Sequence, residues 1–318
     1  MLRILLIDLR YERKNERASW KADFLLNYEH NPEETVLMTP EDDDQQDQIV
    51  LRLAQTEDEV RAAQHLRYVV FYEEFGAKAS DEVRAQKRDF DEYDAYADHL
   101  IIIDEARKPE DGQIVGTYRL FRQERLPAGK EFYTSHEFNI EPLLKSGAKL
   151  LELGRSCVLP EYRTKHIMQK LWEGIADYLA THQIDLMFGC ASLQGTSPEA
   201  ALGQLAYLKH FHEPPESLCP VASPNCLDGL TLPDKDSINA KRVFVSLPPL
   251  IKGYLRVGAY IGSGAYLDTD FNCIDVCIVL PTNQVTAKYM KHFERKIQKE
   301  ILSDSSFNQT YRKENPES

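Results

Sequence analysis

Residues 150–163, which read LLELGRSCVLPEYR, bring a carboxylate, a guanidinium and a thiol together within six residues. In an extended strand the side chain of Glu152 would lie on one face, and those of Arg155 and Cys157 on the other. A buried charge is costly unless it is paired, so Glu152 and Arg155 indicate either an ion pair or a functional site. A partly buried Glu152 could accept a proton, and Cys157 could act as a nucleophile.

A helix is predicted to follow this strand, starting near Lys165 after Pro160, with an apolar face that includes Ile167 and Leu171. The first turn of a helix presents unsatisfied N–H groups and the positive end of the helix dipole to the loop before it. This end therefore suits a phosphate group, and Arg163 beside it adds positive charge.

The elements around this segment predict an α/β fold. Thr56 and Glu59 form a capping-box pattern that begins an amphipathic helix running to about Phe71. Runs at 99–104 and 113–120 predict an antiparallel hairpin. The resulting order, with one strand-to-helix crossover at 149–179, is typical of a mixed sheet.

The rest of the chain divides by composition. We expect strands at 184–192 and within 259–280, helices after residue 192 and at 248–257, and a long loop at 213–239. The charged stretch 80–98 is predicted to be too polar for the core. We therefore expect a polar extension at 1–47, one folded domain at 48–293 and a charged tail at 294–318.

Charge and composition exclude several classes of protein. A net charge of −13 argues against nucleic acid as a partner. The six cysteines are scattered, with no CxxC pair, and no signal segment or apolar run of about 20 residues is present. We expect a cytoplasmic protein with reduced thiols, no metal and no cofactor, whose contact with a membrane would be peripheral.

Residues 150–163 and the helix after them resemble the central strand, loop and helix of the GNAT acyltransferase superfamily. More specifically, the chain resembles the ornithine N-acyltransferases that form ornithine lipids, and the resemblance extends over about residues 49–293. The matching stretches are 52–76, GTYRL (116–120), FYTSHEF (132–138), LELGRSCVLPEYR (151–163), LMFGCAS (186–192), LPPLIKGYLRVGA (247–259) and DFNCIDVCIVLP (270–281).

The resemblance implies a GNAT-like, mixed and twisted sheet whose central strand–loop–helix unit binds the acyl donor. It also implies transfer of a fatty acyl chain, with or without a 3-hydroxyl group, to the α-amino group of ornithine to give lyso-ornithine lipid. Superfamily members usually carry glycines in the loop that binds the coenzyme A diphosphate, but residues 163–168 read RTKHIM. The donor expected here is therefore acyl-phosphopantetheine on acyl carrier protein, with one phosphate.

Site roles follow from that reaction. Glu152 would act as the base with Arg155 beside it. A purely structural role for Glu152, in an ion pair with a neighbouring arginine, is an equally supported interpretation. Backbone N–H groups near Cys157 and Val158 would meet the thioester oxygen, and Ser192 would bind pantetheine or simply end a strand. Arg163 and Lys165 would contact the carrier protein unless they are merely solvated.

A more distant resemblance links the chain to the acyl-homoserine-lactone synthases. It implies that Arg67, Asp91, Asp94 and Arg119 form an ion-pair network that orders the first helix over the sheet. Three alternatives to the ornithine reaction stay open: a homoserine-lactone type of synthesis, an N-acyltransferase for another amino acid, and a regulator that binds acyl carrier protein without turnover.

Overall fold

The computed structural model describes residues 48–224, 227 and 229–282. The whole of the expected extension at 1–47, the expected tail at 294–318 and Cys226 lie outside the described residues. Among the described residues, no helix is long and apolar enough to cross a membrane.

The centre of the fold is an eight-stranded sheet in the order β1-β2-β3-β5-β6-β10-β8, with β9 also paired to β10. All neighbouring strands are antiparallel except β5 and β6, which are parallel. The predicted α/β fold with a mixed sheet is confirmed. The strands are β1 Ile49–Leu53, β2 Asp98–Asp104, β3 Ile114–Arg122, β5 Leu150–Val158, β6 Leu186–Gln194, β8 Tyr260–Ile261, β9 Tyr266–Asp268 and β10 Cys273–Pro281.

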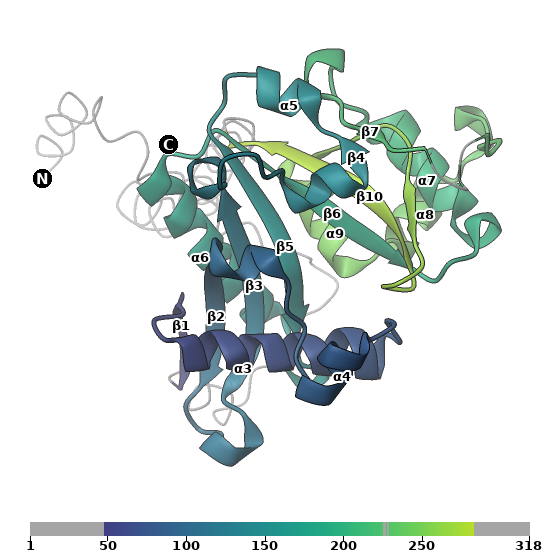
Figure 1. The fold of residues 1–318 in the computed structure, drawn as a ribbon. Helices are drawn as coiled ribbons and strands as arrows, with labels where there is room; N and C mark the ends of the chain where they lie inside the picture. Colours follow the sequence, from purple (N-terminus) through teal and green to yellow (C-terminus); the bar gives the residue numbers. More distant parts are fainter. Residues whose placement is uncertain (1–47, 225–226, 228, 283–318) are drawn as a thin grey trace, which may run out of the picture.

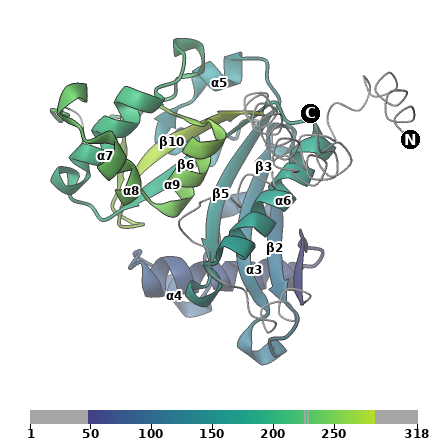
Figure 2. The ribbon, with the colours of Figure 1, turned by 180° about the vertical axis from the view of Figure 1, so that it is seen from behind.

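Helices cover both faces of this sheet. The helix α3 (Glu57–Tyr68) crosses one face over β2 and β3, whereas α6 (Lys165–His182) and α9 (Pro249–Val257) lie on the other (Figures 1 and 2). The largest core cluster forms between the sheet and α6, α7 (Pro198–His212) and α9, and a smaller one lies under α3. Burying apolar side chains on both faces is the main stabilising contribution to such a three-layer arrangement.

Local sequence signals explain where the two helices nearest the centre begin. The hydroxyl of Thr56 accepts a hydrogen bond from the N–H of Glu59 and caps α3, and Thr164 caps α6 through the N–H of Ile167. The first helix continues past its predicted end as a π-helical segment, η3 (Val69–Glu74). Glu74, the last residue of this continuation, forms an ion pair with Arg163 in the loop after β5.

The parallel strands β5 and β6 pair only at their first residues, from Leu150 opposite Leu186 to Glu152 opposite Phe188, and then diverge (Figure 1). Gly189 marks the last close approach. A Cβ atom at this position would collide with the carbonyl oxygen of Leu153, so only glycine lets the two backbones meet here. Beyond this point the sheet opens into two arms. One arm contains β1, β2, β3 and β5, and the other contains β6, β8, β9 and β10.

Two sequence predictions need correction, and one helix was not predicted. The charged stretch 80–98 forms α4 (Asp81–Gln86) and the 3₁₀ turn η4 (Glu92–Ala95), and it buries Asp89 and Asp94 among arginine side chains. The predicted loop 213–239 contains β7 (Val221–Ala222), which pairs with β4 (Phe138–Asn139) in a second small sheet. The helix α8 (Ala240–Ser246) was not predicted, because its seven residues are too short for a periodic signal.

The remaining elements match their predictions or are short connections. The hairpin of β2 and β3 is confirmed, as are the strand–loop–helix unit of β5 and α6 and the helix α9. The short segment α5 (Glu141–Lys145) and the turn η7 (Tyr133–His136) connect β3 to β5 and lie at the end of the sheet where β5 and β6 pair.

Candidate active site

A cleft of about 1110 Å³ occupies the space between the diverging strands. This volume is slightly above the roughly 300–1,000 Å³ range typical of ligand pockets, so the cleft has room for more than one small substrate. Its walls are β5 from Glu152 to Val158, β6 from Met187 to Gln194, η3, the start of α9 and residues 268–275.

The predicted site residues are largely gathered around this cleft. Glu152, Arg155, Cys157, Val158, Arg163 and Ser192 all line it, together with Arg119. Lys165 begins α6 but is not among the lining residues.

Glu152 lines the cleft where the pairing of β5 with β6 ends, with only 4% of its surface exposed. Its carboxylate accepts hydrogen bonds from the N–H groups of Tyr133 and Thr134, at 3.1 and 2.6 Å, and from the hydroxyl of Thr134. Burial raises the pKa of Glu152, and these hydrogen bonds oppose the rise. Glu152 therefore holds the start of η7 in place, and it forms no ion pair within 4 Å in the described part of the chain.

Arg155 lies on the same face of the sheet as Glu152, which corrects the alternation predicted from the sequence. It has a left-handed backbone (φ 50°), and the register between β3 and β5 shifts beside it, where Arg119 pairs with Gly154 and Thr117 with Cys157. Such a β-bulge adds one residue to a strand and reverses the facing of the residues after it. Cys157 consequently also faces α3.

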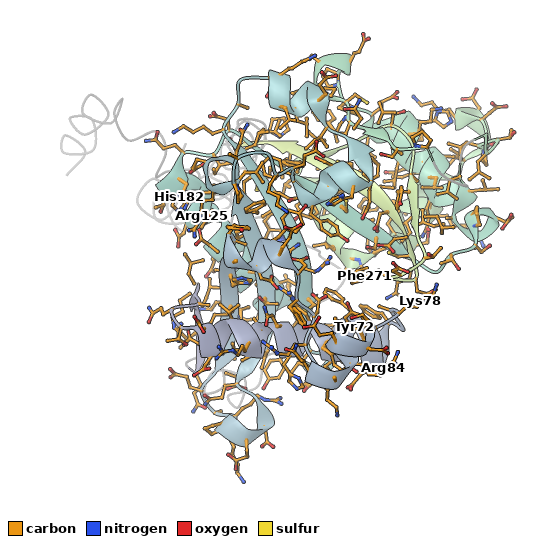
Figure 3. The ribbon with its side chains drawn as sticks, viewed as in Figure 1. Tyr72, Lys78, Arg84, Arg125, His182 and Phe271 are labelled. Atoms are coloured by element: carbon orange, nitrogen blue, oxygen red, sulfur yellow. The ribbon has the colours of Figure 1, made fainter. Side chains whose placement is uncertain are left out.

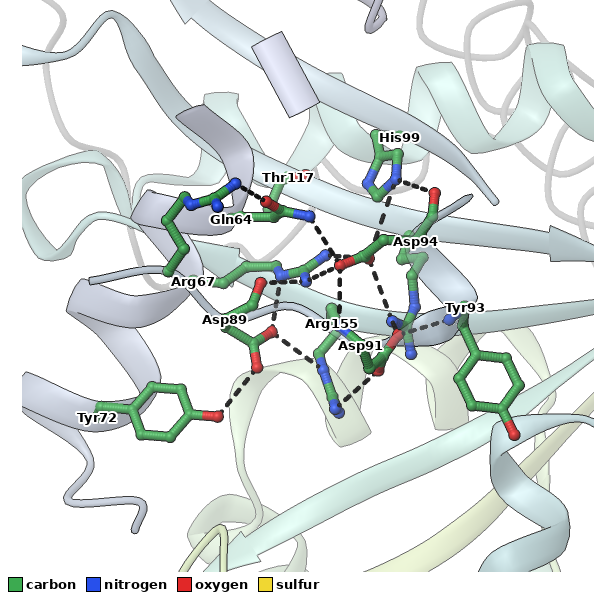
Figure 4. Close-up of polar contacts among 12 residues, drawn as sticks. Gln64, Arg67, Tyr72, Asp89, Asp91, Tyr93, Asp94, His99, Thr117 and Arg155 are labelled. Atoms are coloured by element: carbon green, nitrogen blue, oxygen red, sulfur yellow. Dashed lines mark hydrogen bonds and ion pairs between the residues drawn. The ribbon is translucent and has the colours of Figure 1, made fainter. Parts of the chain in front are cut away.

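The bulge places the guanidinium of Arg155 between two aromatic rings. Its Cζ atom lies 4.6 Å from the ring centroids of both Tyr133 and Phe271. Arg155 also forms ion pairs with Asp89 at 3.2 Å and with Asp91 at 3.3 Å. It thus connects the cleft with a larger charged cluster under α3 (Figure 4).

That cluster, which we call the arginine–aspartate network, contains Arg67, Arg119 and Arg155 and the carboxylates of Asp89, Asp91 and Asp94. Its charges balance, three against three. Arg67 is fully buried and binds Asp94 through two hydrogen bonds of 2.8 and 2.9 Å (Figure 4).

The network sets the ionisation of its own members. Burial alone would raise the pKa values of Asp89 and Asp94, but the neighbouring arginines outweigh it and hold both pKa values below the ordinary range. Asp89 was missed in the sequence, although it precedes Asp91 and Asp94 in the same segment and could have been noted from the rule that buried charges pair.

Cys157 does not have the environment of an activated nucleophile. Its side chain is buried beneath α3, and burial raises the pKa of its thiol well above the usual range. A reactive cysteine requires a stabilised thiolate, usually near a positive charge and partly exposed.

Arg163 fastens the loop after β5 to η3 at the mouth of the cleft. Its guanidinium pairs through both terminal nitrogens with the carboxylate of Glu74, and its Nε donates to the carbonyl of Val158 at 3.1 Å. A carrier-protein contact by Arg163 would therefore involve a side chain that is already paired.

The two arms meet again across the cleft mouth, in contacts that we call the clasp. The N–H of Lys78 donates to the carbonyl of Asp270 at 2.6 Å, and the side chain of Asn272 donates to the carbonyl of Phe75 at 3.4 Å. The rings of Tyr72 and Phe271 lie 5.9 Å apart beside these bonds (Figure 3).

A second group of acidic side chains lines the other arm and was not predicted. Glu137 follows η7, and Asp275 lies on β10 directly opposite Ser192 of β6. Both carboxyls are 4% exposed. Burial, and then the proximity of Asp275, raise the pKa of Glu137, while burial raises that of Asp275.

Comparison with known proteins gives a consistent result. The family profile described as "Acetyltransferase (GNAT) domain" matches residues 66–173. The chain is 43% identical over 245 residues to an L-ornithine N(alpha)-acyltransferase of Agrobacterium fabrum, covering 76% of this chain and 84% of that protein. It is 42% identical over 246 residues to a protein of the same name from Brucella abortus, covering 76% and 88%.

Among solved structures, the AHL synthase LasI aligns over 73% of this chain and 89% of its own, with 13% identity and a TM-score of 0.38.

Proposed function

Because this chain belongs to the family of L-ornithine N(alpha)-acyltransferases, we propose that it transfers a fatty acyl group from a thioester donor to the α-amino group of L-ornithine. The observation that carries this proposal is the cleft between β5 and β6, which is open along the strand edges and acidic at one wall. A long acyl donor and a small cationic amino acid require these two properties.

The reaction needs three contributions from the protein. The α-amino group must lose a proton, the tetrahedral oxyanion must be stabilised, and the thiolate must leave. The amine nitrogen forms a bond to the thioester carbon, the carbon–sulfur bond breaks, and the nitrogen's proton passes to a base. Glu152 lines the cleft and is buried, which supports its proposed part as that base or as the group that fixes η7 around it.

The open edge of β5 supports a site for the donor. Its pairing with β6 ends at Glu152, so backbone groups further along this edge have no strand partner among the described residues. The two amide groups of a pantetheine arm can add to such an edge as an extra strand would. Cys157 and Val158 lie along this stretch, and their backbone would then face the thioester.

We further propose that the donor is an acyl carrier protein. The loop between β5 and α6 contains no glycine, and its arginine, Arg163, is held by Glu74. This loop is poorly suited to wrap around a diphosphate but sufficient for the single phosphate of a carrier protein. Such a donor would place the reaction in the cytoplasm, and the amphiphilic product would leave towards a membrane surface.

The test is a reconstituted reaction with the full chain, L-ornithine, and either acyl carrier protein or coenzyme A bearing the same 3-hydroxyacyl group. We expect N-acylornithine, in which mass spectrometry locates the acyl group on the α-nitrogen. We also expect a higher kcat/KM with the carrier protein than with coenzyme A. Equal or better use of the coenzyme A thioester would refute the carrier proposal, and the absence of N-acylornithine with both donors would refute the function itself.

The same assay addresses the role of Glu152. In the Glu152→Gln variant we expect kcat to fall by roughly 10²-fold or more if Glu152 is the base. A folded variant with a near-normal rate and an unchanged pH profile would remove Glu152 from the chemistry. Formation of a homoserine lactone from S-adenosylmethionine would favour the rival type of synthesis.

A further inference from the structure

We propose that Glu137 and Asp275 form a binding site for the side-chain ammonium group of the amino acid acceptor, so that the enzyme selects a diamino acid. This inference rests on the proposed function and deepens it. The relatives' name specifies the nitrogen that is acylated, whereas this site concerns the other nitrogen of the same substrate.

The first observation is that the two carboxyls lie in the cleft and are deeply buried. Both are 4% exposed, and both belong to its lining. They come from different elements, Glu137 from the segment after η7 and Asp275 from β10. Two carboxylates in direct contact repel each other and are costly to bury without a counter-charge.

The second observation is that one acceptor atom is unsatisfied. The Oε2 atom of Glu137 is buried and has no hydrogen-bond donor in the described part of the chain. Buried polar atoms in native structures nearly always have a partner, and an orphan in a substrate cleft indicates a group that a ligand completes.

The third observation is that, among the residues the structure describes, neither carboxyl forms an ion pair with a basic side chain. The charged groups that act most strongly on Glu137 and Asp275 are acidic: each feels the other and Asp268, and no basic side chain is among them. In contrast, every aspartate of the arginine–aspartate network has an arginine partner. The protein balances charge on one wall of the cleft and leaves it unbalanced on the other.

The polar and titratable groups that face the pair supply hydrogen bonds but no positive charge. Cys190 hydrogen-bonds Glu137, and Ser192 and Cys273 hydrogen-bond Asp275, whereas Tyr133, Asp268 and Cys277 face the pair without a hydrogen bond to it. The raised pKa of Glu137 favours a proton on the pair, which lowers the repulsion between the two carboxyls. A primary ammonium would replace that proton with a full positive charge and three N–H donors.

Selection of a diamino acid follows from the position of this pair. The donor thioester is proposed to lie along the β5 edge, and the pair lies across the cleft on β10 and the segment after η7. An acceptor whose side-chain ammonium is held there would direct its α-amino group towards β5. An acceptor without that ammonium would lack the contact and leave two carboxyls facing an apolar side chain.

The experiment compares L-ornithine with L-2-aminopentanoate, which has the same carbon skeleton without the δ-ammonium group. The measured quantity is the ratio of their kcat/KM values with one acyl donor. For the unmodified protein we expect ornithine to be favoured by roughly 10- to 100-fold, the range of one charge-assisted contact. In Glu137→Gln and Asp275→Asn this ratio should fall towards one, while 2-aminopentanoate is still acylated.

A matched control variant is Asp104→Asn. Asp104 is also a buried carboxylate, with hydrogen bonds from Tyr162 and the N–H of Ala106, but it lies outside the cleft. This variant should keep the preference for ornithine even if its stability falls. Circular dichroism and thermal unfolding of all three variants separate loss of folding from loss of recognition.

Several outcomes would overturn the inference. An unchanged ornithine preference in folded Glu137→Gln and Asp275→Asn would show that the ammonium binds elsewhere. An equal fall of kcat for both acceptors would assign the pair to the reacting amine instead. Activity that EDTA abolishes and Zn²⁺ restores would mean that Asp268, Cys273 and Asp275 hold a metal ion. If the unmodified protein acylates neither compound, the proposed function itself fails.

Discussion

Replacing Arg67 by methionine should destabilise the protein strongly, since this guanidinium is fully buried at the centre of the arginine–aspartate network. Methionine has a similar length without the charge. The change removes the ion pairs to Asp89 at 2.7 Å and to Asp94 at 2.8 Å, and the balance of the network shifts from zero to one excess negative charge.

The size of the loss in unfolding free energy depends on the ion pairs that remain in the network. Breaking a buried ion pair by removing one partner costs about 3–5 kcal/mol. Each aspartate keeps a second arginine at 3.2 Å, Arg155 for Asp89 and Arg119 for Asp94. We therefore expect the lower end, a loss of about 3 kcal/mol in the free energy of unfolding, which corresponds to a Tm lower by on the order of 10 °C.

The assay is urea unfolding followed by circular dichroism, with Arg61→Met as the matched control. Arg61 lies on the same helix and pairs with Glu57 and Asp58, but its side chain is 50% exposed, so its loss should cost about 0–1 kcal/mol. Because the arginines lower the pKa values of the two buried aspartates, the stabilisation should be present above about pH 4 and lost as the pH falls. Equal effects of the two substitutions at pH 7 would refute the account of the network.

Three further predictions concern the cleft. Gly189→Ala should force the backbone of β6 away from the carbonyl of Leu153 and lower acyl transfer by about 10²-fold, which initial rates would show. Cys157→Ser should keep at least about half of the turnover, because the buried thiol has a raised pKa; trapping of an acyl-enzyme on Cys157 would contradict this. Glu137 has a raised pKa in the folded protein, so its protonation stabilises the fold below about pH 5 and this contribution is lost as the pH rises. In the Glu137→Gln variant, the free energy of unfolding should therefore fall less steeply between about pH 5 and 8. The contribution of one proton to this slope is at most about 1.4 kcal/mol per pH unit. A slope equal to that of the unmodified protein would contradict the assignment.

The parts of the fold with local, periodic signals could be predicted from the sequence. Thr56 and Thr164 mark the starts of α3 and α6, and alternation marks β2 and β3. These features depend on residues within a few positions of one another. The sequence of the strand–loop–helix unit also resembled the family closely enough to identify site residues, most of which line one cleft in the structure.

Other features depend on contacts that no local pattern contains. The bulge at Arg155 arises from a left-handed backbone at a residue other than glycine, and alternation gave no sign of it. Glu137 and Asp275 are separated by more than a hundred residues in the chain, and only the folded arrangement of η7 and β10 brings them to one cleft. Asp89 lies in a stretch predicted to be exposed, whereas in the structure it is buried beneath α3.

The clasp has a consequence for how a ligand reaches the cleft. The backbones of β5 and β6 are joined at Glu152 and Phe188, and the two arms are joined again through residues 72–78 and 270–272. Together these connections form a closed ring of protein around the space between them. The space that a ligand would occupy is therefore bounded at one end by the pairing of β5 with β6 and at the other by the clasp.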